Sequence, residues 1–115
     1  MFEPAEIRAL LIEAARQRQV FTYGALLNLL GHTFTRPLMR ALCKVLDRID
    51  EDGRVAGEPG LAVLVVRQSD GLPGQGWFVS RTGIYDDLPL EWEGAEAQRY
   101  TKARQAEAFD YWEAP

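Results

Sequence analysis

The chain has 115 residues, of which 47% are hydrophobic and 26% are charged, a balance typical of a folded globular protein. This length allows one domain, and the single cysteine excludes an intrachain disulfide. One cysteine and one histidine cannot supply the four ligands of a usual zinc site. The N-terminus lacks the pattern of a signal peptide, and no apolar run approaches the roughly 20 residues that span a membrane. We therefore expect one soluble, cytoplasmic domain without metal, cofactor or membrane partner.

The net charge of −4 is unevenly distributed along the chain. Residues 1–48 contain seven Lys/Arg and four Asp/Glu, whereas residues 49–115 contain six and thirteen, which gives net charges of +3 and −7. A local excess of cations matters more than the total charge for a surface that contacts nucleic acid. The N-terminal half is therefore the place to expect such a surface.

Apolar spacing and capping residues predict three helices within residues 1–50. The second helix is expected to begin at the N-cap Thr22 and to run to Leu30, where Gly31 ends it in a left-handed conformation. The third helix carries Pro37 in its first turn and is expected to end near residues 49–50, before a break at residues 51–53. The first helix is predicted from one apolar stripe, formed by Ile7, Leu10, Leu11, Ala14 and Ala15.

The second half of the chain predicts a β-hairpin and a terminal helix. Residues 61–66 form a continuous apolar run typical of a buried strand, residues 68–76 have the composition of a loop, and residues 77–80 would be the returning strand. Residues 94–112 are rich in helix-forming residues. The sequence therefore predicts an α+β fold resembling a winged helix-turn-helix, with three helices in 1–50, a hairpin in 61–80 and a C-terminal helix in 94–112.

In a winged helix the third helix enters the major groove and the hairpin contacts the DNA backbone beside it. Arg36 and Arg40 lie on the outward face of the predicted third helix with Lys44 on its flank, so these cations are expected to face the groove. A solvated surface is the alternative explanation for the same charges. The expected backbone contacts, around the turn and on the wing, are Thr22, Tyr23, Thr33, Thr35 and Arg67.

Residues 20–42 resemble the helix-turn-helix of the alkylguanine alkyltransferases and alkyltransferase-like proteins. The resemblance rests on Thr22-Tyr23 before the second helix, Gly31 after it and Arg36 at the start of the third. It implies that Tyr23 would act at a target phosphate and that Arg36 would fill the stack left by a flipped base. The acceptor motif Pro-Cys-His-Arg of that family is absent, so the resemblance does not imply alkyl transfer.

The segment from residue 61 to 78 resembles a segment of small uncharacterised bacterial proteins, some of them joined to nuclease domains. Its run Gly71-Leu72-Pro73-Gly74 contains the glycines of a hairpin tip rather than a phosphate loop, because no Lys-Ser/Thr pair follows them. This second resemblance favours a role connected with DNA.

Other residues have weaker functional interpretations. Cys43 is either a reactive thiol or a passive one, and His32 is expected to be a turn or capping residue. Asp86, Asp87, Glu91 and Glu93 form an acidic cluster that is either a metal or hydrolytic site or a solvated surface.

The sequence thus predicts a non-enzymatic, regulatory or accessory DNA-binding protein. The alternative is a protein-interaction module, or a homodimer, that uses the acidic and aromatic C-terminal half, where Tyr111 and Trp112 lie.

Overall fold

The centre of the fold is a short parallel pair of strands from two apolar segments. The structure is a computed structural model and describes residues 2–113. β1 (Phe21–Thr22) pairs with β2 (Val65–Val66), and Phe21 lies opposite Val65. The 3₁₀ helix η1 (Ala62–Leu64) immediately precedes β2, and residues 61–66 are all buried. This apolar run is interior as predicted, but only two of its residues are in a strand.

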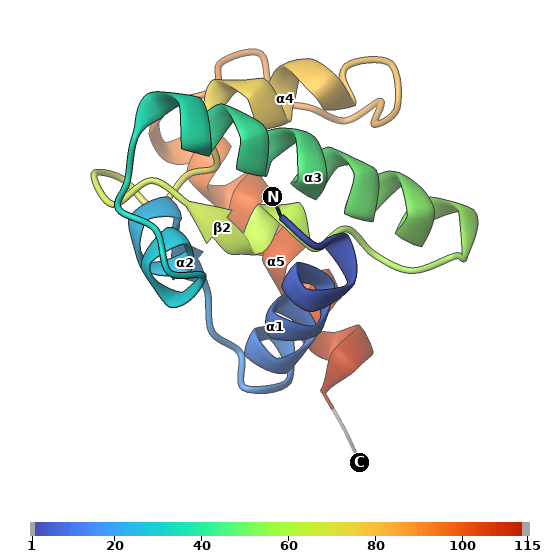
Figure 1. Cartoon of the computed structure of the whole chain (residues 1–115). Helices are drawn as coiled ribbons and strands as arrows, with labels where there is room; N and C mark the ends of the chain where they lie inside the picture. The colour runs from blue at the N-terminus through green and yellow to red at the C-terminus, as the bar shows by residue number, and fades with distance from the viewer. Residues whose placement is uncertain (1, 114–115) are drawn as a thin grey trace.

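Helices surround this central segment in an α+β arrangement (Figure 1). In the view of Figure 1, α3 and α4 lie above β2 and α1 lies below it, whereas α5 passes behind β2 and ends beside α1. η1 contacts α1, α3 and α5, so the buried apolar run joins the helices into one core. None of the helices within residues 2–113 is both long and apolar enough to cross a membrane. The helices are α1 (Pro4–Arg16), α2 (Tyr23–Leu29), α3 (Arg36–Val55), α4 (Gln75–Arg81) and α5 (Gly94–Trp112).

The predicted helices of the N-terminal half and the C-terminal helix are confirmed. Thr22 caps α2 by accepting a hydrogen bond from the Ala25 amide at 3.1 Å. Gly31 ends the helix with a φ of +88°, where the His32 amide donates to the Leu27 carbonyl at 2.9 Å. This Schellman arrangement satisfies carbonyls that the helix would otherwise leave unpaired. The local signals therefore fix α2 at both ends.

The predicted end of the third helix was wrong, because α3 continues to Val55. Gly53 does not break the helix. It is buried, and a methyl group added there would contact the side chain of Glu58. The chain leaves the helix at Gly57, which lies two residues after Val55 and has a φ of +78°, and the Glu58 amide donates to the Gly53 carbonyl at 2.8 Å. The stop signal is therefore the glycine four residues later.

The predicted β-hairpin was also wrong, and with it the winged-helix topology is not seen in residues 2–113. β2 pairs in parallel with β1, and residues 77–80 belong to α4. The buried side chains of α4 are Trp77, Phe78 and Arg81, a helical spacing that a strand with one buried face would not produce. Tertiary packing of the two aromatic rings therefore overrides the strand propensity of this segment.

Candidate functional site

Four cations follow one another along the outside of α3 at intervals of four residues. We call Arg36, Arg40, Lys44 and Arg48 the basic row. All four are exposed, and the first three form no ion pair within the part of the chain that the structure describes. Arg48 has one long contact, at 3.9 Å from Asp52. Four residues advance an α-helix by about 6 Å, so the row presents evenly spaced positive charge over about 18 Å.

The sequence-based interpretation did not include Arg48 in this surface. Arg48 stands four residues after Lys44, as Lys44 stands four after Arg40, so the spacing alone would have revealed it. The row therefore extends one helical turn beyond the predicted site.

The threonines of the predicted site have different roles. Thr22 and Thr35 are N-caps, and Thr35 accepts a hydrogen bond from the Leu38 amide at 3.2 Å. Their side chains are therefore engaged in capping the N-terminal ends of α2 and α3. Thr33 is exposed in the turn before α3 and remains available for contact with a partner.

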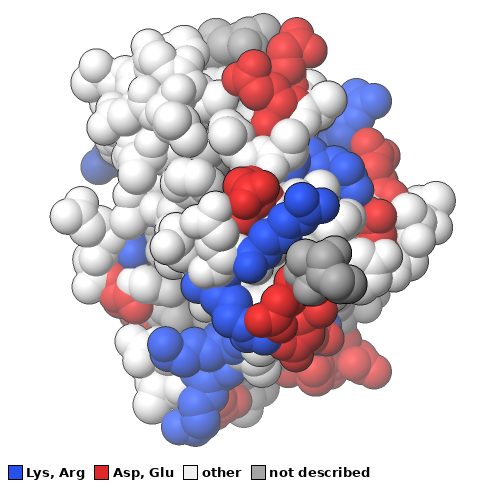
Figure 2. All heavy atoms as spheres, turned by 90° about the horizontal axis from the view of Figure 1, so that it is seen from below, with Lys and Arg blue, Asp and Glu red and all other residues white. Residues whose placement is uncertain are grey.

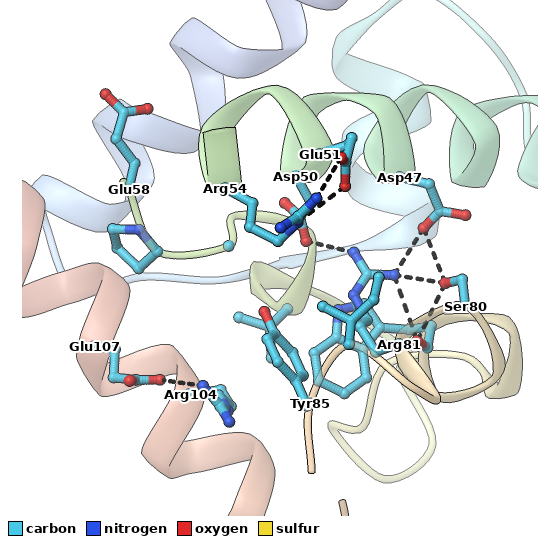
Figure 3. A pocket seen from close by; sticks show the side chains of 15 residues that line it. Asp47, Asp50, Glu51, Arg54, Glu58, Ser80, Arg81, Tyr85, Arg104 and Glu107 are labelled. Carbon is cyan, nitrogen blue, oxygen red and sulfur yellow. Dashed lines mark hydrogen bonds and ion pairs between the residues drawn. The ribbon is translucent and has the colours of Figure 1, made fainter. Parts of the chain in front are cut away.

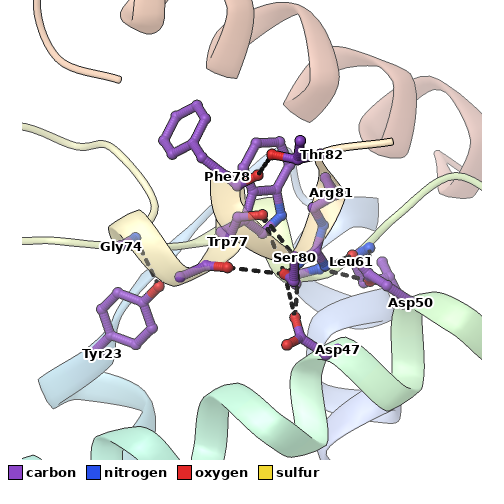
Figure 4. Close-up of polar contacts among 12 residues, drawn as sticks. Tyr23, Asp47, Asp50, Leu61, Gly74, Trp77, Phe78, Ser80, Arg81 and Thr82 are labelled. Atoms are coloured by element: carbon purple, nitrogen blue, oxygen red, sulfur yellow. Dashed lines mark hydrogen bonds and ion pairs between the residues drawn. The ribbon is translucent and has the colours of Figure 1, made fainter. Parts of the chain in front are cut away.

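Tyr23 lies inside the protein and not on its surface. It is 5% exposed, and its hydroxyl accepts a hydrogen bond from the Gly74 amide at 3.0 Å (Figure 4). Burial raises the pKa of Tyr23 to about 12. Burial, together with the nearby Asp47, also raises the pKa of the neighbouring Cys43 thiol. Tyr23 thus ties α2 to the loop before α4, and Cys43 fits the passive interpretation.

We expect Tyr23→Phe to lower the free energy of unfolding by about 1–3 kcal/mol, because it leaves the buried Gly74 amide without an acceptor. Urea unfolding followed by circular dichroism measures the change. Tyr111→Phe is the control, because the side chain of Tyr111 is 53% exposed and should tolerate loss of its hydroxyl. Equal unfolding midpoints for the two variants would contradict the assigned role of Tyr23.

Arg67 is held within its own loop. Its guanidinium donates to Asp70 at 2.7 Å, and Asp70 also accepts from the Leu72 amide at 3.1 Å. Gly71, with a φ of +72°, allows the loop to fold back. Arg67 is therefore not part of a wing, and contact with DNA would require it to leave Asp70.

A pocket of about 220 Å³ opens between α3, α4 and α5 (Figure 3). Carboxylates and guanidinium groups face one another across it, with Tyr85 between α3 and α5. The sequence-based interpretation named none of its charged residues as a site. Its charged lining is Asp47, Asp50, Glu51, Arg54, Glu58, Arg81, Arg104 and Glu107.

The most buried charged residue of the pocket lining is Arg81, which is 4% exposed. Its guanidinium donates to Asp47 at 2.7 Å and to Asp50 (Figure 4), and its central carbon lies 4.9 Å from the centre of the Trp77 ring. Burial disfavours the charge, but Asp50 and Asp47 outweigh burial and raise the pKa of Arg81. Arg81 therefore remains charged and joins α4 to α3.

Asp50 also shapes the chain that follows α3. Its second carboxylate oxygen accepts from the amides of Leu61 at 2.7 Å and Ala62 at 3.0 Å. A methyl group at Gly60 would lie 2.9 Å from Asp50, so glycine is needed where the backbone passes this carboxylate. The Asp50–Arg81 pair thus positions the start of the central segment as well as α4.

Arg104, which lines the pocket from α5, makes a second set of contacts. Arg104 lies 4.1 Å from the centre of the Tyr85 ring and donates to Asp87 at 2.8 Å. Although burial opposes it, the hydrogen bonds from Arg104 and Tyr100 lower the pKa of Asp87. One member of the predicted acidic cluster is therefore a structural partner of α5, and residues 2–113 contain no group of three or more potential metal ligands.

The charged residues of the pocket form ion pairs that hold the helices around it together. Within residues 2–113, each of its five carboxylates is paired with an arginine, including Glu58 with Arg8 from α1. The lining carries two more negative than positive charges, so a small cation would fit it better than an anion. Ser80 also lines the pocket, but His32 packs edge-on against Phe2 outside it, so no histidine base accompanies this hydroxyl. We assign no reaction to this pocket.

On the face formed by α1 and the end of α5, cations form a diagonal band with acids beside it (Figure 2). Arg18 is paired there with Asp110 at 2.6 Å and Glu113 at 2.8 Å. Trp112 is half-buried beneath Arg8, whereas Tyr111 is exposed. The aromatic surface expected for a partner is thus largely used to dock α5 onto α1.

Comparisons with protein-family models, curated proteins and solved structures found no match. The resemblance of residues 20–42 to the alkyltransferase helix-turn-helix therefore stays a prediction.

Proposed function

We propose that this protein binds DNA without catalysing a reaction on it, and that the basic row of α3 is the contact surface. The observation that carries the proposal is the run of four exposed cations, three of them without a carboxylate partner in residues 2–113. Other cations of the chain, such as Arg81 and Arg104, are neutralised within the fold. The row is thus a place where positive charge is both concentrated and free to meet phosphates.

The contacts expected from this surface are mainly electrostatic. Each cation of the row would neutralise a phosphate and release a counterion, so affinity would fall as salt rises. Arg36 and the exposed Thr33 lie at the N-terminal end of α3, where side chains of a docked helix reach furthest into a ligand. The proposal therefore predicts salt-sensitive binding with modest sequence preference.

The test compares two double variants with the same change in charge. Arg40→Ala/Lys44→Ala removes two cations of the row, and Arg99→Ala/Lys102→Ala removes two exposed cations of α5 that form no ion pair within residues 2–113. We expect the first pair to weaken binding of a fluorescein-labelled oligonucleotide by roughly ten-fold at low salt and the second pair to have little effect. Fluorescence anisotropy measures both. Equal losses would show that only net charge matters, and no binding by the wild type would contradict the proposal.

A protein partner is the second candidate, favoured by one observation. Residues 19–35 contain no charged side chain, and the side of Figure 2 on which α2 lies is largely free of charge. Val20 and Leu29 are 43% and 57% exposed on this segment. This uncharged surface, rather than the C-terminal aromatic helix, is where such a partner would bind.

A further inference from the structure

One exposed aromatic side chain stands at the N-terminal end of the basic row. Phe34 directly precedes Thr35, the N-cap of α3, and lies two residues before Arg36. It is 46% exposed and is not among the side chains that pack against the core. An apolar residue at this position often packs onto the fourth residue of the helix, here Met39. Phe34 nevertheless leaves nearly half of its surface to solvent, which a purely structural role does not require.

The cations of α3 form a narrow row that winds around the helix, because each step of four residues turns it by about 40°. At about 100° per residue, Asp47 and Glu51 fall on the same side of α3 as Arg36 and Arg40, but further along the helix, where they line the pocket and pair with arginines of the fold. A groove of duplex DNA has a phosphate backbone on each side, and this one row of cations on α3 would reach only one of them. The structure also has no hairpin within residues 2–113 to contact a second backbone. One line of charge matches one strand.

We propose that the DNA bound by the basic row is single-stranded, and that the ring of Phe34 stacks on an unpaired base at the N-terminal end of the row. This inference rests on the proposed function and specifies its ligand. Every base offers a flat face, so stacking on an aromatic ring adds affinity without requiring a particular sequence. The row holds the phosphates, and Phe34 holds a base that a duplex would keep paired.

The test uses a labelled thymidine oligomer of about 12 nucleotides, a length within the range bound by single-strand-binding folds, and its duplex with the adenosine complement. We expect tighter binding of the single strand by the wild type. Phe34→Ala should weaken that binding by roughly ten-fold, Phe34→Tyr should retain it, and Phe34→Leu should lose it because leucine keeps apolar volume without a flat ring. Circular dichroism checks that each variant is folded.

The outcomes separate this inference from the proposed function. If Arg40→Ala/Lys44→Ala weakens binding but Phe34→Ala does not, the stacking role is wrong and the basic row stands. If Phe34→Leu binds like the wild type, or the duplex binds as tightly as the single strand, stacking on an unpaired base is also overturned. If neither DNA binds at low salt, both proposals fail.

If sedimentation shows that the wild type self-associates and Phe34→Ala does not, the ring is a contact between copies of this chain. The inference is supported only by selective loss of single-strand affinity in the alanine and leucine variants.

Discussion

Replacing Arg81 by methionine is expected to lower the free energy of unfolding by about 3–5 kcal/mol, because it leaves a buried carboxylate without its cation. Asp50 has a side chain that is 11% exposed, so water cannot replace the lost partner fully. Methionine fills part of the volume beside Trp77 but donates no hydrogen bond. The shift in urea midpoint at constant slope measures the effect.

Two further variants identify the cause of this loss. Arg54→Met removes a cation that lines the same pocket but pairs with Glu51 at the surface, and we expect no measurable change. Arg81→Met/Asp50→Asn removes both charges while keeping an acceptor for the Leu61 amide, and it should be more stable than Arg81→Met alone. A double variant less stable than the single one would show that lost packing, and not an unpaired charge, dominates.

Phe78→Ala is expected to lower the free energy of unfolding by about 3–5 kcal/mol, since it removes a fully buried ring from the core. Phe78 stacks on Trp92 with ring centres 5.5 Å apart, and it meets Trp77 edge-on at 5.0 Å. Its loss would leave a cavity between α4 and the segment before α5. Thermal and urea unfolding measure the change.

Val79→Ala is the matched control, because Val79 is 59% exposed on the opposite side of α4. In a strand, Val79 would share a face with Trp77, and Phe78 would point away from both. A large loss at Phe78 with none at Val79 is therefore the signature of the helix. Comparable losses at the two positions would contradict the described packing of α4.

The parts of the fold that the sequence predicted correctly are those set by local signals. Thr22 and Gly31 bound α2 because their effects reach only a few residues along the chain. The C-terminal helix also has the predicted bounds, 94–112. The end of α3 was misplaced because Gly53, at a cost of only about 1 kcal/mol, does not break the helix, which continues to Val55. Gly57 carried the correct signal.

The parts that could not be predicted depend on contacts between distant segments. β1 and β2 have two residues each, and neither could indicate a parallel partner more than forty positions away. Arg81 meets Asp47 and Asp50 across 34 and 31 positions, so no spacing in the sequence marked the pocket. Tyr23 matched a surface motif in sequence, yet its hydroxyl is enclosed by the loop at Gly74. Of the candidate sites, only the basic row could be inferred from the sequence, because four-residue spacing on one helix is a local pattern.

The salt dependence of DNA binding tests the central claim most directly. The logarithm of the binding constant, plotted against the logarithm of salt concentration, has a slope proportional to the number of phosphates neutralised. For a single strand we predict that Arg40→Ala/Lys44→Ala makes this slope shallower by about 1.4, at about 0.7 for each lost contact. Arg99→Ala/Lys102→Ala should leave the slope unchanged. Identical slopes for the wild type and both double variants, or no binding at the lowest salt, would contradict the assignment of α3 as the DNA-binding surface.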